Sequence, residues 1–293
     1  MTKYAYFPGC SADSTGIPFT LSTNFLLDKV GIELVEIPDW CCCGTSAARL
    51  TNTDLGHALP ARSLALAEQM GEPLDVLAPC AGCSFSLKNT VFHARQSEQN
   101  RTHLEELIGM PYAASAEVLG LLEILAVEDV RDRIRNTMVR DLGGLKVACY
   151  YGCALVRPPA VCAFDDTEDP QSMDGLMALA GAEPVAWAFK TECCGASHQI
   201  ALPKGSRGLL ERIFANAAAN GAQAIVTACP LCMLNLDMRE AEVNRTRALP
   251  FDLPIFYFTE LLGYALGGEQ HELGLDRHFW PVPGLTSKEV VAP

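Results

Sequence analysis

The amino-acid sequence predicts an α/β fold of two duplicated domains, each with a small, mostly parallel sheet and a cysteine-ligated metal cluster. Short runs rich in Val, Ile, Tyr and Phe alternate along the chain with longer stretches that carry apolar residues at helical spacing. One pattern of five cysteines also occurs twice, once in each half and in the same order. Strand–helix alternation is typical of sheets covered by helices. The repeated cysteines indicate that one such unit was duplicated.

In the first half, the apolar runs predict three strands, and the helical spacing predicts helices between them. The strands are expected at residues 4–7, 33–37 and 75–78, and the helices at residues 21–30 and 60–70. A longer helix is expected to begin at Ser115, a good N-cap residue, with Val118, Leu121, Leu122 and Leu125 on one face. Gly or Pro residues bound the predicted strands.

The second half repeats this order. Strands are expected at residues 146–151, 184–189 and 224–228, with a helix at residues 209–220. A boundary is expected at Leu142-Gly143-Gly144, which gives domains of residues 1–142 and 143–293. With 293 residues and 49% apolar content, the chain is long and apolar enough for two cores of ordinary size.

Ten of the thirteen cysteines form the repeated pattern, in which a single Cys is followed by Cys-Cys-Gly and then by Cys-x-x-Cys. The first set is Cys10, Cys42, Cys43, Cys80 and Cys83, and the second set is Cys153, Cys193, Cys194, Cys229 and Cys232. On the predicted fold, each lies where a strand ends or a helix begins. Three loops at one edge of a parallel sheet can therefore converge on one cluster. Helix N-termini at that edge favour thiolate ligands.

Five thiols in each half exceed the four ligands of a structural zinc site or of an ordinary iron–sulfur cube. The Gly after each adjacent pair permits a turn in which both sulfurs face one site. Neighbouring thiolates can then reach different irons of one cluster. Either one cysteine is spare in each half, or the cluster is larger or more open than a cube. We expect an iron–sulfur cluster in each half, with structural zinc in one half as the alternative.

Three cysteines lie outside the pattern. Cys41 precedes the first adjacent pair, so the choice of pair is open. Aligning the glycines that close the two pairs favours Cys42 and Cys43, and leaves Cys41 as an accessory thiol. Cys149 and Cys162 are expected to be small buried hydrophobes.

The composition excludes several classes of partner. The chain has 22 basic and 35 acidic side chains, and its net charge of −13 makes nucleic acids and anionic lipids poor candidates. No run of about 18 uncharged apolar residues occurs, so no membrane span is expected. The N-terminal residues reach Cys10 without the apolar stretch of a signal peptide. Thirteen cysteines without such a signal point to a reducing compartment, the cytoplasm, and to metal ligation in place of disulfides.

Three segments are the most specific evidence for a resemblance to a known family: residues 34–44, residues 150–158, and Cys193-Cys194-Gly195-Ala196-Ser197-His198. With them, nearly the whole chain resembles the B subunit of heterodisulfide reductase and its bacterial relatives, which are built from two cysteine-rich CCG domains. The resemblance implies two noncubane 4Fe–4S clusters, each held by five cysteines, with the substrate disulfide cleaved between them. Carried over to this chain, the ligands are the first and second sets.

His198 follows the second Cys-Cys-Gly, at a place where the first copy has Ala47. Because imidazole titrates near neutral pH, His198 is a candidate proton donor to a leaving thiolate. A hydrogen-bonding role within its loop is the alternative. Arg157, Lys190 and Lys204 flank the second set and are candidates for holding an anionic substrate, although surface salt bridges explain the lysines more simply.

The sequence holds no dinucleotide fingerprint, no P-loop and no further four-cysteine set. Electrons are therefore expected from partner chains, an iron–sulfur relay subunit and a flavin-containing subunit of the same complex. The substrate is expected to be a thiol or disulfide, or a sulfur carrier. Bacterial relatives tied to sulfur oxidation leave its identity and the reaction direction open.

Three functions follow from these observations. The favoured one is an oxidoreductase subunit that makes or breaks a disulfide between the halves. The expected walls of its site are the loops of Cys10, Cys42 and Cys43 on one side and of Cys193, Cys194 and His198 on the other. The second function is an electron-transfer subunit of a succinate- or fumarate-reductase-like complex. The third is a scaffold with structural zinc in one half and no turnover.

Overall fold

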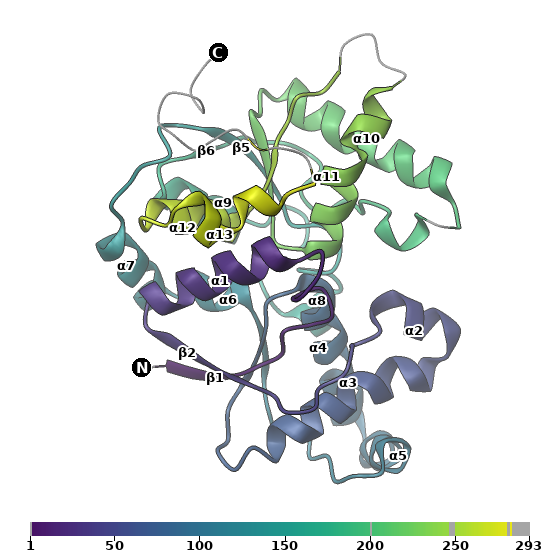
Figure 1. Cartoon of the computed structure of the whole chain (residues 1–293). Coiled ribbons are helices and arrows are strands. Elements are labelled where there is room, and N and C mark those ends of the chain that lie inside the picture. Colours follow the sequence, from purple (N-terminus) through teal and green to yellow (C-terminus); the bar gives the residue numbers. More distant parts are fainter. Residues whose placement is uncertain (1, 200, 246–249, 280–281, 283–293) are drawn as a thin grey trace.

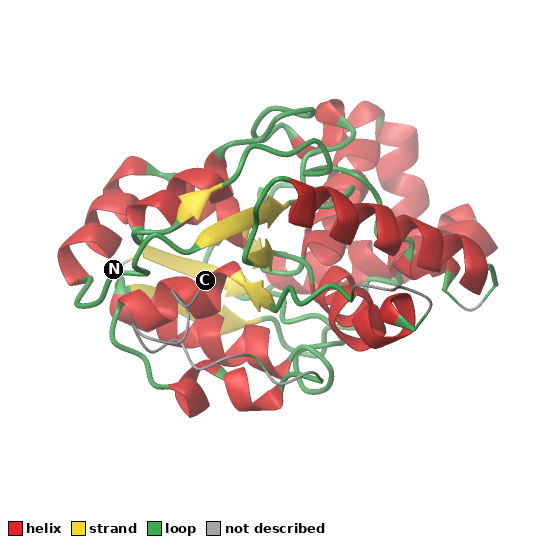
Figure 2. Ribbon diagram, turned by 90° about the horizontal axis from the view of Figure 1, so that it is seen from above, coloured by secondary structure: helices red, strands yellow, loops and turns green. Residues whose placement is uncertain are grey.

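Two four-stranded parallel sheets form the centre of the protein, one from each half of the chain. The computed structural model describes residues 2–199, 201–245, 250–279 and 282. Helices lie on either side of the strands (Figures 1 and 2). The predicted α/β fold with two small parallel sheets is therefore confirmed.

The first sheet has the strand order β2-β1-β3-β4. Its strands are β1 (Thr2–Tyr6), β2 (Ile32–Glu36), β3 (Val76–Ala78) and β4 (Val118–Gly120). Its helices are α1 (Ile17–Lys29), α2 (Thr45–Thr51), α3 (Thr53–Glu68), α4 (Ala81–Gln96), α5 (Glu98–Ile108), α6 (Leu121–Ala126) and α7 (Glu128–Thr137).

The second sheet repeats this arrangement in the order β6-β5-β7-β8. Its strands are β5 (Lys146–Tyr150), β6 (Glu183–Pro184), β7 (Ala224–Thr227) and β8 (Ile255–Tyr257). Its helices are α8 (Pro159–Cys162), α9 (Ser172–Leu179), η1 (Ala196–His198), α10 (Pro203–Ala219), α11 (Pro230–Asn244), α12 (Phe258–Ala265), α13 (Gln270–Leu273) and η2 (Leu275–Arg277).

The long helix expected to begin at Ser115 is wrong. Val118 begins the short strand β4, which pairs with β3, and only from Leu121 does the chain become helical. Ser115 does not cap a helix, because its backbone N–H and its hydroxyl both donate to Glu68. A strand that runs directly into a helix leaves one continuous apolar run, and periodicity alone does not divide it.

Two further differences concern the second sheet. The strand expected at residues 184–189 stops at Pro184, because the indole N–H of Trp187 takes over the bond to the Cys149 carbonyl at 3.1 Å. The edge strand β8 follows the second Cys-x-x-Cys helix and was not among the predicted strands. Its three residues carry too little pattern for a prediction.

The hydrophobic core crosses from one half to the other. Helix α1 of the first half packs against α12 and α13 of the second half (Figure 1). Phe19 of α1 stacks on Tyr257, with ring centroids 4.6 Å apart. One apolar cluster joins these residues to the interior of the second half, and a smaller cluster fills the rest of the first half. The two halves therefore share a packed core. The domain boundary near residue 142 stays a prediction that rests on the sequence repeat alone.

A glutamate with little or no exposure stands at the same place in both halves, as the third residue of the helix after the fourth strand. Glu123 of α6 forms an ion pair with Lys88 of α4. Glu260 of α12 is fully buried, and its Oε1 lies 2.6 Å from Nε2 of His278. Asp237 stands eight residues after the first cysteine of its Cys-x-x-Cys, as Lys88 does in the first half. His278 therefore supplies the positive charge that α11 lacks at that position.

Candidate metal centre and its pocket

Every cysteine of the two sets lies at the edge of its sheet where the strands end. Cys10 and Cys153 follow β1 and β5, the first strand of each half. Cys80 and Cys229 follow β3 and β7 and stand at the N-caps of the long helices α4 and α11. The N-terminal end of a helix favours a thiolate over a thiol there. The fold therefore places both sets where the sequence predicts them.

The two sets also share the same division between exposed and buried sulfurs. In each, the single cysteine and the first of the adjacent pair are exposed, and the other three are buried. The second of the pair contacts the second cysteine of the Cys-x-x-Cys. The Sγ–Sγ distance is 3.3 Å between Cys43 and Cys83 and 3.6 Å between Cys194 and Cys232.

Backbone amides and glycines fit closely around the sulfurs. The N–H groups of Gly44 and Gly195 donate to the first sulfur of each adjacent pair, at 3.4 and 3.3 Å. Gly9 and Gly152 have φ of +80° and +70°, and each precedes the single cysteine of its set. A Cβ at Gly9 would lie 3.0 Å from Cys83 Sγ, and one at Gly152 would lie 3.2 Å from Cys232 Sγ. Both loops are therefore closed against the sulfurs so tightly that a side chain does not fit.

Neighbouring thiols make some of these sulfurs acidic. Hydrogen bonding from Cys42, and then from Cys83, lowers the pKa of the Cys43 thiol to about 3. Hydrogen bonding from Cys153 lowers the pKa of Cys193 to about 6, against the effect of burial. Each half can thus hold at least one thiolate at neutral pH, which is the form that binds metals.

The two sets meet at the interface between the halves. The thiols of Cys80 and Cys229, the first cysteines of the two Cys-x-x-Cys motifs, lie close enough that each shifts the pKa of the other. Both are buried. The two candidate metal sites are therefore adjacent.

The remaining cysteines lie apart from this arrangement. Cys41 Sγ faces α3, 3.4 Å from the Leu59 carbonyl and 3.8 Å from the Ser63 hydroxyl. Cys149 and Cys162 are buried, as expected, with exposed fractions of 0% and 2%. The position of Cys41 agrees with its predicted role as an accessory thiol.

A pocket of about 530 Å³ opens beside the second set, between the halves. All five cysteines of that set line it, together with His198. The opposite wall comes from α2 and the start of α4, and includes Arg49 and Phe85. No cysteine of the first set lines it, whereas Thr45 and Ser46, directly after Cys42-Cys43-Gly44, do, so the expected wall formed by the loops of Cys10, Cys42 and Cys43 stays a prediction. The residues after Gly44, and not the cysteines before it, turn toward the second half.

Two serines join the walls of this pocket. Ser46 and Ser197 stand two residues after the closing glycine of their respective Cys-Cys-Gly, and their hydroxyl oxygens are 2.7 Å apart. Sequence reasoning did not single out these serines, Arg49 or Phe85. The equal spacing of the two serines from the repeated glycines was the available signal.

The comparisons with known proteins agree with this geometry. The model of a protein family described as CCG, cysteine-rich domain, matches residues 4–88 and 147–237. The chain belongs to this family. It is 30% identical over 279 residues to the 8-methylmenaquinol:fumarate reductase membrane anchor subunit of Wolinella succinogenes, covering 94% of this chain and 96% of that one. It is also 30% identical over 285 residues to the B subunit of the Ferredoxin/F(420)H(2)-dependent CoB-CoM heterodisulfide reductase of Methanosarcina acetivorans, covering 95% and 94%.

The resemblance of this CCG-family chain to the B subunit of heterodisulfide reductase is thereby confirmed. Among solved structures, a hypothetical protein from Helicobacter pylori aligns with a TM-score of 0.74 at 12% identity, over 96% of this chain and 52% of that one. At that identity the likeness shows a shared fold. Within the described residues, no helix is both long and apolar enough to cross a membrane.

The donor set of the chain fits an iron–sulfur group in each half. It consists of thiols alone, and glycines without side chains surround it. Among the described residues, no three Cys, His, Asp or Glu side chains gather as ligands of a single metal ion. Pairs of neighbouring sulfurs that come from different loops suit a cluster of several irons, because each thiolate can bind a different iron atom.

His198 and the flanking cations have different surroundings. His198 lines the pocket, and its charge is one of the influences that lower the pKa of Cys193, after the Cys153 hydrogen bond. Arg157 donates to Glu168 and to the Thr167 carbonyl. Lys204 is exposed.

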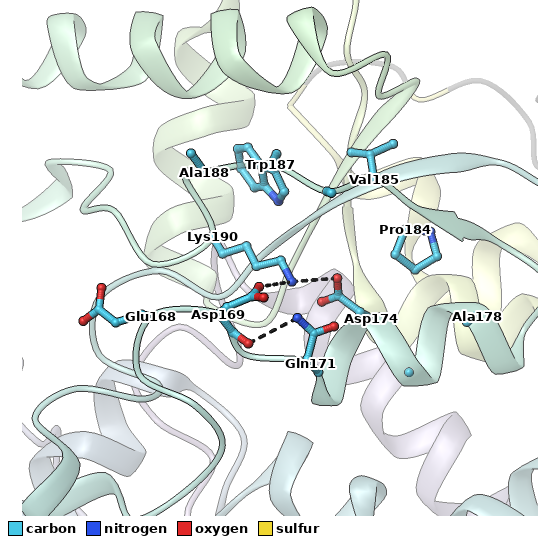
Figure 3. Close-up of a pocket in the computed structure, with 12 residues that line it drawn as sticks. Glu168, Asp169, Gln171, Asp174, Ala178, Pro184, Val185, Trp187, Ala188 and Lys190 are labelled. Carbon is cyan, nitrogen blue, oxygen red and sulfur yellow. Dashed lines mark hydrogen bonds and ion pairs between the residues drawn. The ribbon is translucent and has the colours of Figure 1, made fainter.

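Lys190 is buried, so a surface salt bridge does not describe it. Figure 3 shows its ammonium group between Asp169 and Asp174, at 2.8 and 3.0 Å. These residues line a separate cavity of about 650 Å³ that no motif cysteine reaches. The Lys190 carbonyl accepts the N–H groups of Tyr151 and Gly152. Lys190 therefore holds the loop that leads to Cys153, and its ammonium is already paired with two carboxylates.

Proposed function

We propose that the chain is the iron–sulfur subunit of a heterodisulfide-reductase-like complex, in which thiol–disulfide chemistry takes place at two noncubane 4Fe–4S clusters. The ligands in this proposal are the ten cysteines of the first and second sets. The pocket beside the second set is the observation that carries the proposal. A molecule held there touches the candidate metal site directly and is enclosed by residues of both halves.

The reaction consumes two electrons and two protons: one disulfide gives two thiols, and the reverse reaction releases the same electrons and protons. When bound, the clusters supply single electrons and iron atoms that accept sulfur ligands. His198 lies at the pocket, where its imidazole is the proposed proton donor to a leaving thiolate. The Ser46–Ser197 hydrogen bond holds the two walls together around the substrate.

The lining of the pocket favours a substrate with an apolar stem and an anionic end. The net charge of the chain is −13, yet no Asp or Glu is among the described residues that line this pocket. Arg49 lies over the Phe85 ring, 5.3 Å from its centroid, at a rim that also includes Leu50 and Leu231. A guanidinium at an apolar rim binds a carboxylate, phosphate or sulfonate.

Partner subunits complete the proposal. Two of the relatives are named as B subunits of heterodisulfide reductases that use ferredoxin, which supports electron delivery by partner subunits. The partners in this proposal are an iron–sulfur relay subunit and a flavin-containing subunit. The proposed location of this complex is the cytoplasm.

Metal analysis and thiol binding test the function. Anaerobically purified full-length protein is expected to contain about eight irons per chain, from two four-iron clusters. Addition of candidate thiols to oxidised protein is expected to change the EPR spectrum, with broadening when the thiol carries ³³S. Arg49→Gln is expected to weaken binding of an anionic thiol about tenfold while leaving that of a neutral thiol unchanged, since about 1.4 kcal/mol corresponds to a factor of ten.

Zinc in place of four irons would assign one half to a structural role, and zinc alone would exclude the enzyme. Full iron content without any response to thiols would favour the second function, electron transfer in a fumarate-reductase-like complex. The name of the Wolinella succinogenes relative is the specific observation in favour of that function. Reversible cluster reduction without thiol binding is its expected signature.

A further inference from the structure

The hydroxyl of Tyr257 is a buried polar group without a protein partner. Tyr257 ends β8, its side chain is fully buried, and its hydroxyl has no hydrogen bond to any of the described residues. Phe19 stacks against the ring, with centroids 4.6 Å apart, and so restricts how it can turn. A buried donor without an acceptor costs desolvation free energy that Phe at this position would not. The hydroxyl is therefore able to donate to a group that the polypeptide itself does not supply, and its position decides whether such a group is near.

The strand register places Tyr257 close to the second set of cysteines. Tyr257 pairs in register with Thr227 of β7, two residues before Cys229. The thiols of Cys229 and of Cys80 from the first set each shift the pKa of the other. The strand register and the electrostatic influence of both thiols on its hydroxyl place Tyr257 near this pair, which we call the sulfur junction (Cys80 and Cys229).

The electrostatics of the phenol agree with this position. Burial raises the pKa of Tyr257 well above its usual value, and the charges of Glu260, Cys229 and Cys80 raise it further. The hydroxyl therefore keeps its proton at neutral pH and acts as a donor.

The first half has no counterpart of this hydroxyl. Gly120 ends β4 in the same register, opposite Ala78, two residues before Cys80. Because Gly has no side chain, Tyr257 supplies a donor from one side only. A single hydroxyl thus serves a junction shared by both sets.

We infer that the Tyr257 hydroxyl donates a hydrogen bond to the cluster sulfurs at the sulfur junction and raises the reduction potential there. Tyr257 is a positioning and tuning residue in this inference, which rests on the proposed function in so far as that function places clusters on the two sets. The physical reason is that a reduced cluster carries more negative charge than an oxidised one. A fixed donor therefore stabilises the reduced form, and hydrogen bonds to the sulfurs are one of the factors that set such potentials.

The test compares Tyr257→Phe with Tyr112→Phe in the full-length protein purified anaerobically. Tyr112 is a matched control, because it is 1% exposed and its hydroxyl also lacks a partner, but it packs in the first-half core beside Glu68 and Arg95. Redox titrations followed by EPR measure the cluster potentials, and iron analysis measures loading. Tyr257→Phe is expected to keep its iron and to show a lower midpoint potential. Tyr112→Phe is expected to titrate like the wild type.

A second measurement follows exchange of the hydroxyl proton for deuterium. Resonance Raman bands of the iron–sulfur bonds are expected to shift more in D₂O for the wild-type protein than for Tyr257→Phe, because both share the backbone N–H donors and only the wild type has the hydroxyl. Equal shifts in the two proteins would contradict the inference. Loaded Tyr257→Phe protein with wild-type potentials would overturn the inference and leave the proposed function in place. An equal shift of the potential in Tyr112→Phe would also overturn it. Wild-type protein without iron would instead contradict the proposed function itself.

Discussion

Replacing Gly9 by Ala tests how closely the chain is packed against its sulfurs. The φ of Gly9 is +80°, a left-handed conformation that costs other residues about 1–2 kcal/mol. The new Cβ would also lie 3.0 Å from Cys83 Sγ, which is closer than the two atoms can remain. We expect the backbone cost to appear in the free energy of unfolding. Because Cys83 Sγ would be displaced, we also expect iron to be lost from the first set.

Gly31→Ala is the matched control for this prediction. Gly31 has a φ of +71°, and a Cβ there would meet no atom within 4 Å, so only the backbone cost applies. At about 2 °C per kcal/mol for a chain of this size, Gly31→Ala is expected to lower the melting temperature by about 2–4 °C and to keep its iron. Gly9→Ala is expected to melt lower still and to lose about half of the iron. Thermal unfolding by circular dichroism and iron analysis measure both. Full iron content in Gly9→Ala, with a melting temperature equal to that of Gly31→Ala, would refute the packing argument.

Three further predictions follow. Cys42→Ser is expected to remove iron from the first set, whereas Cys41→Ser keeps it, because Cys41 faces α3; iron analysis that gave the reverse would reassign the pair. Burial lowers the pKa of His278, but the Glu260 charge and hydrogen bond outweigh it and raise the net pKa above 6.5. The stability that protonated His278 contributes is therefore present below pH 6.5 and is lost as the pH rises through its pKa in the folded state. In urea titrations at several pH values, the free energy of unfolding of His278→Gln is expected not to show this loss. Lys190→Met is expected to lower the free energy of unfolding by about 3 kcal/mol, since it leaves Asp174 buried without its cation; a change below about 1 kcal/mol in urea titration would contradict this.

Much of the architecture was predictable because the chain repeats itself. The glycines after the two adjacent cysteine pairs align Cys42 with Cys193 and Cys43 with Cys194, and the structure gives both pairs the same burial. The apolar run at the start of β7 stands alone between loop residues, so its strand was predicted correctly.

The errors arose where a tertiary contact overrides a local pattern. β4 and α6 share one apolar run, and only pairing with β3 separates them. Trp187 ends β6 through a side-chain hydrogen bond that no propensity encodes. The pocket wall around Arg49 depends on how the two halves pack against each other. Local patterns in a single sequence do not predict that packing.

The ion pair between Glu260 and His278 has a consequence for the order of biosynthesis. Translation proceeds from the N-terminus, and early segments begin to fold while later ones are still being made. Glu123 receives its cation from Lys88, which is translated before it. Glu260 waits for His278, which the ribosome adds eighteen residues later. We therefore expect the first half to reach its final charge balance during synthesis, and the second half only after η2 has left the ribosome.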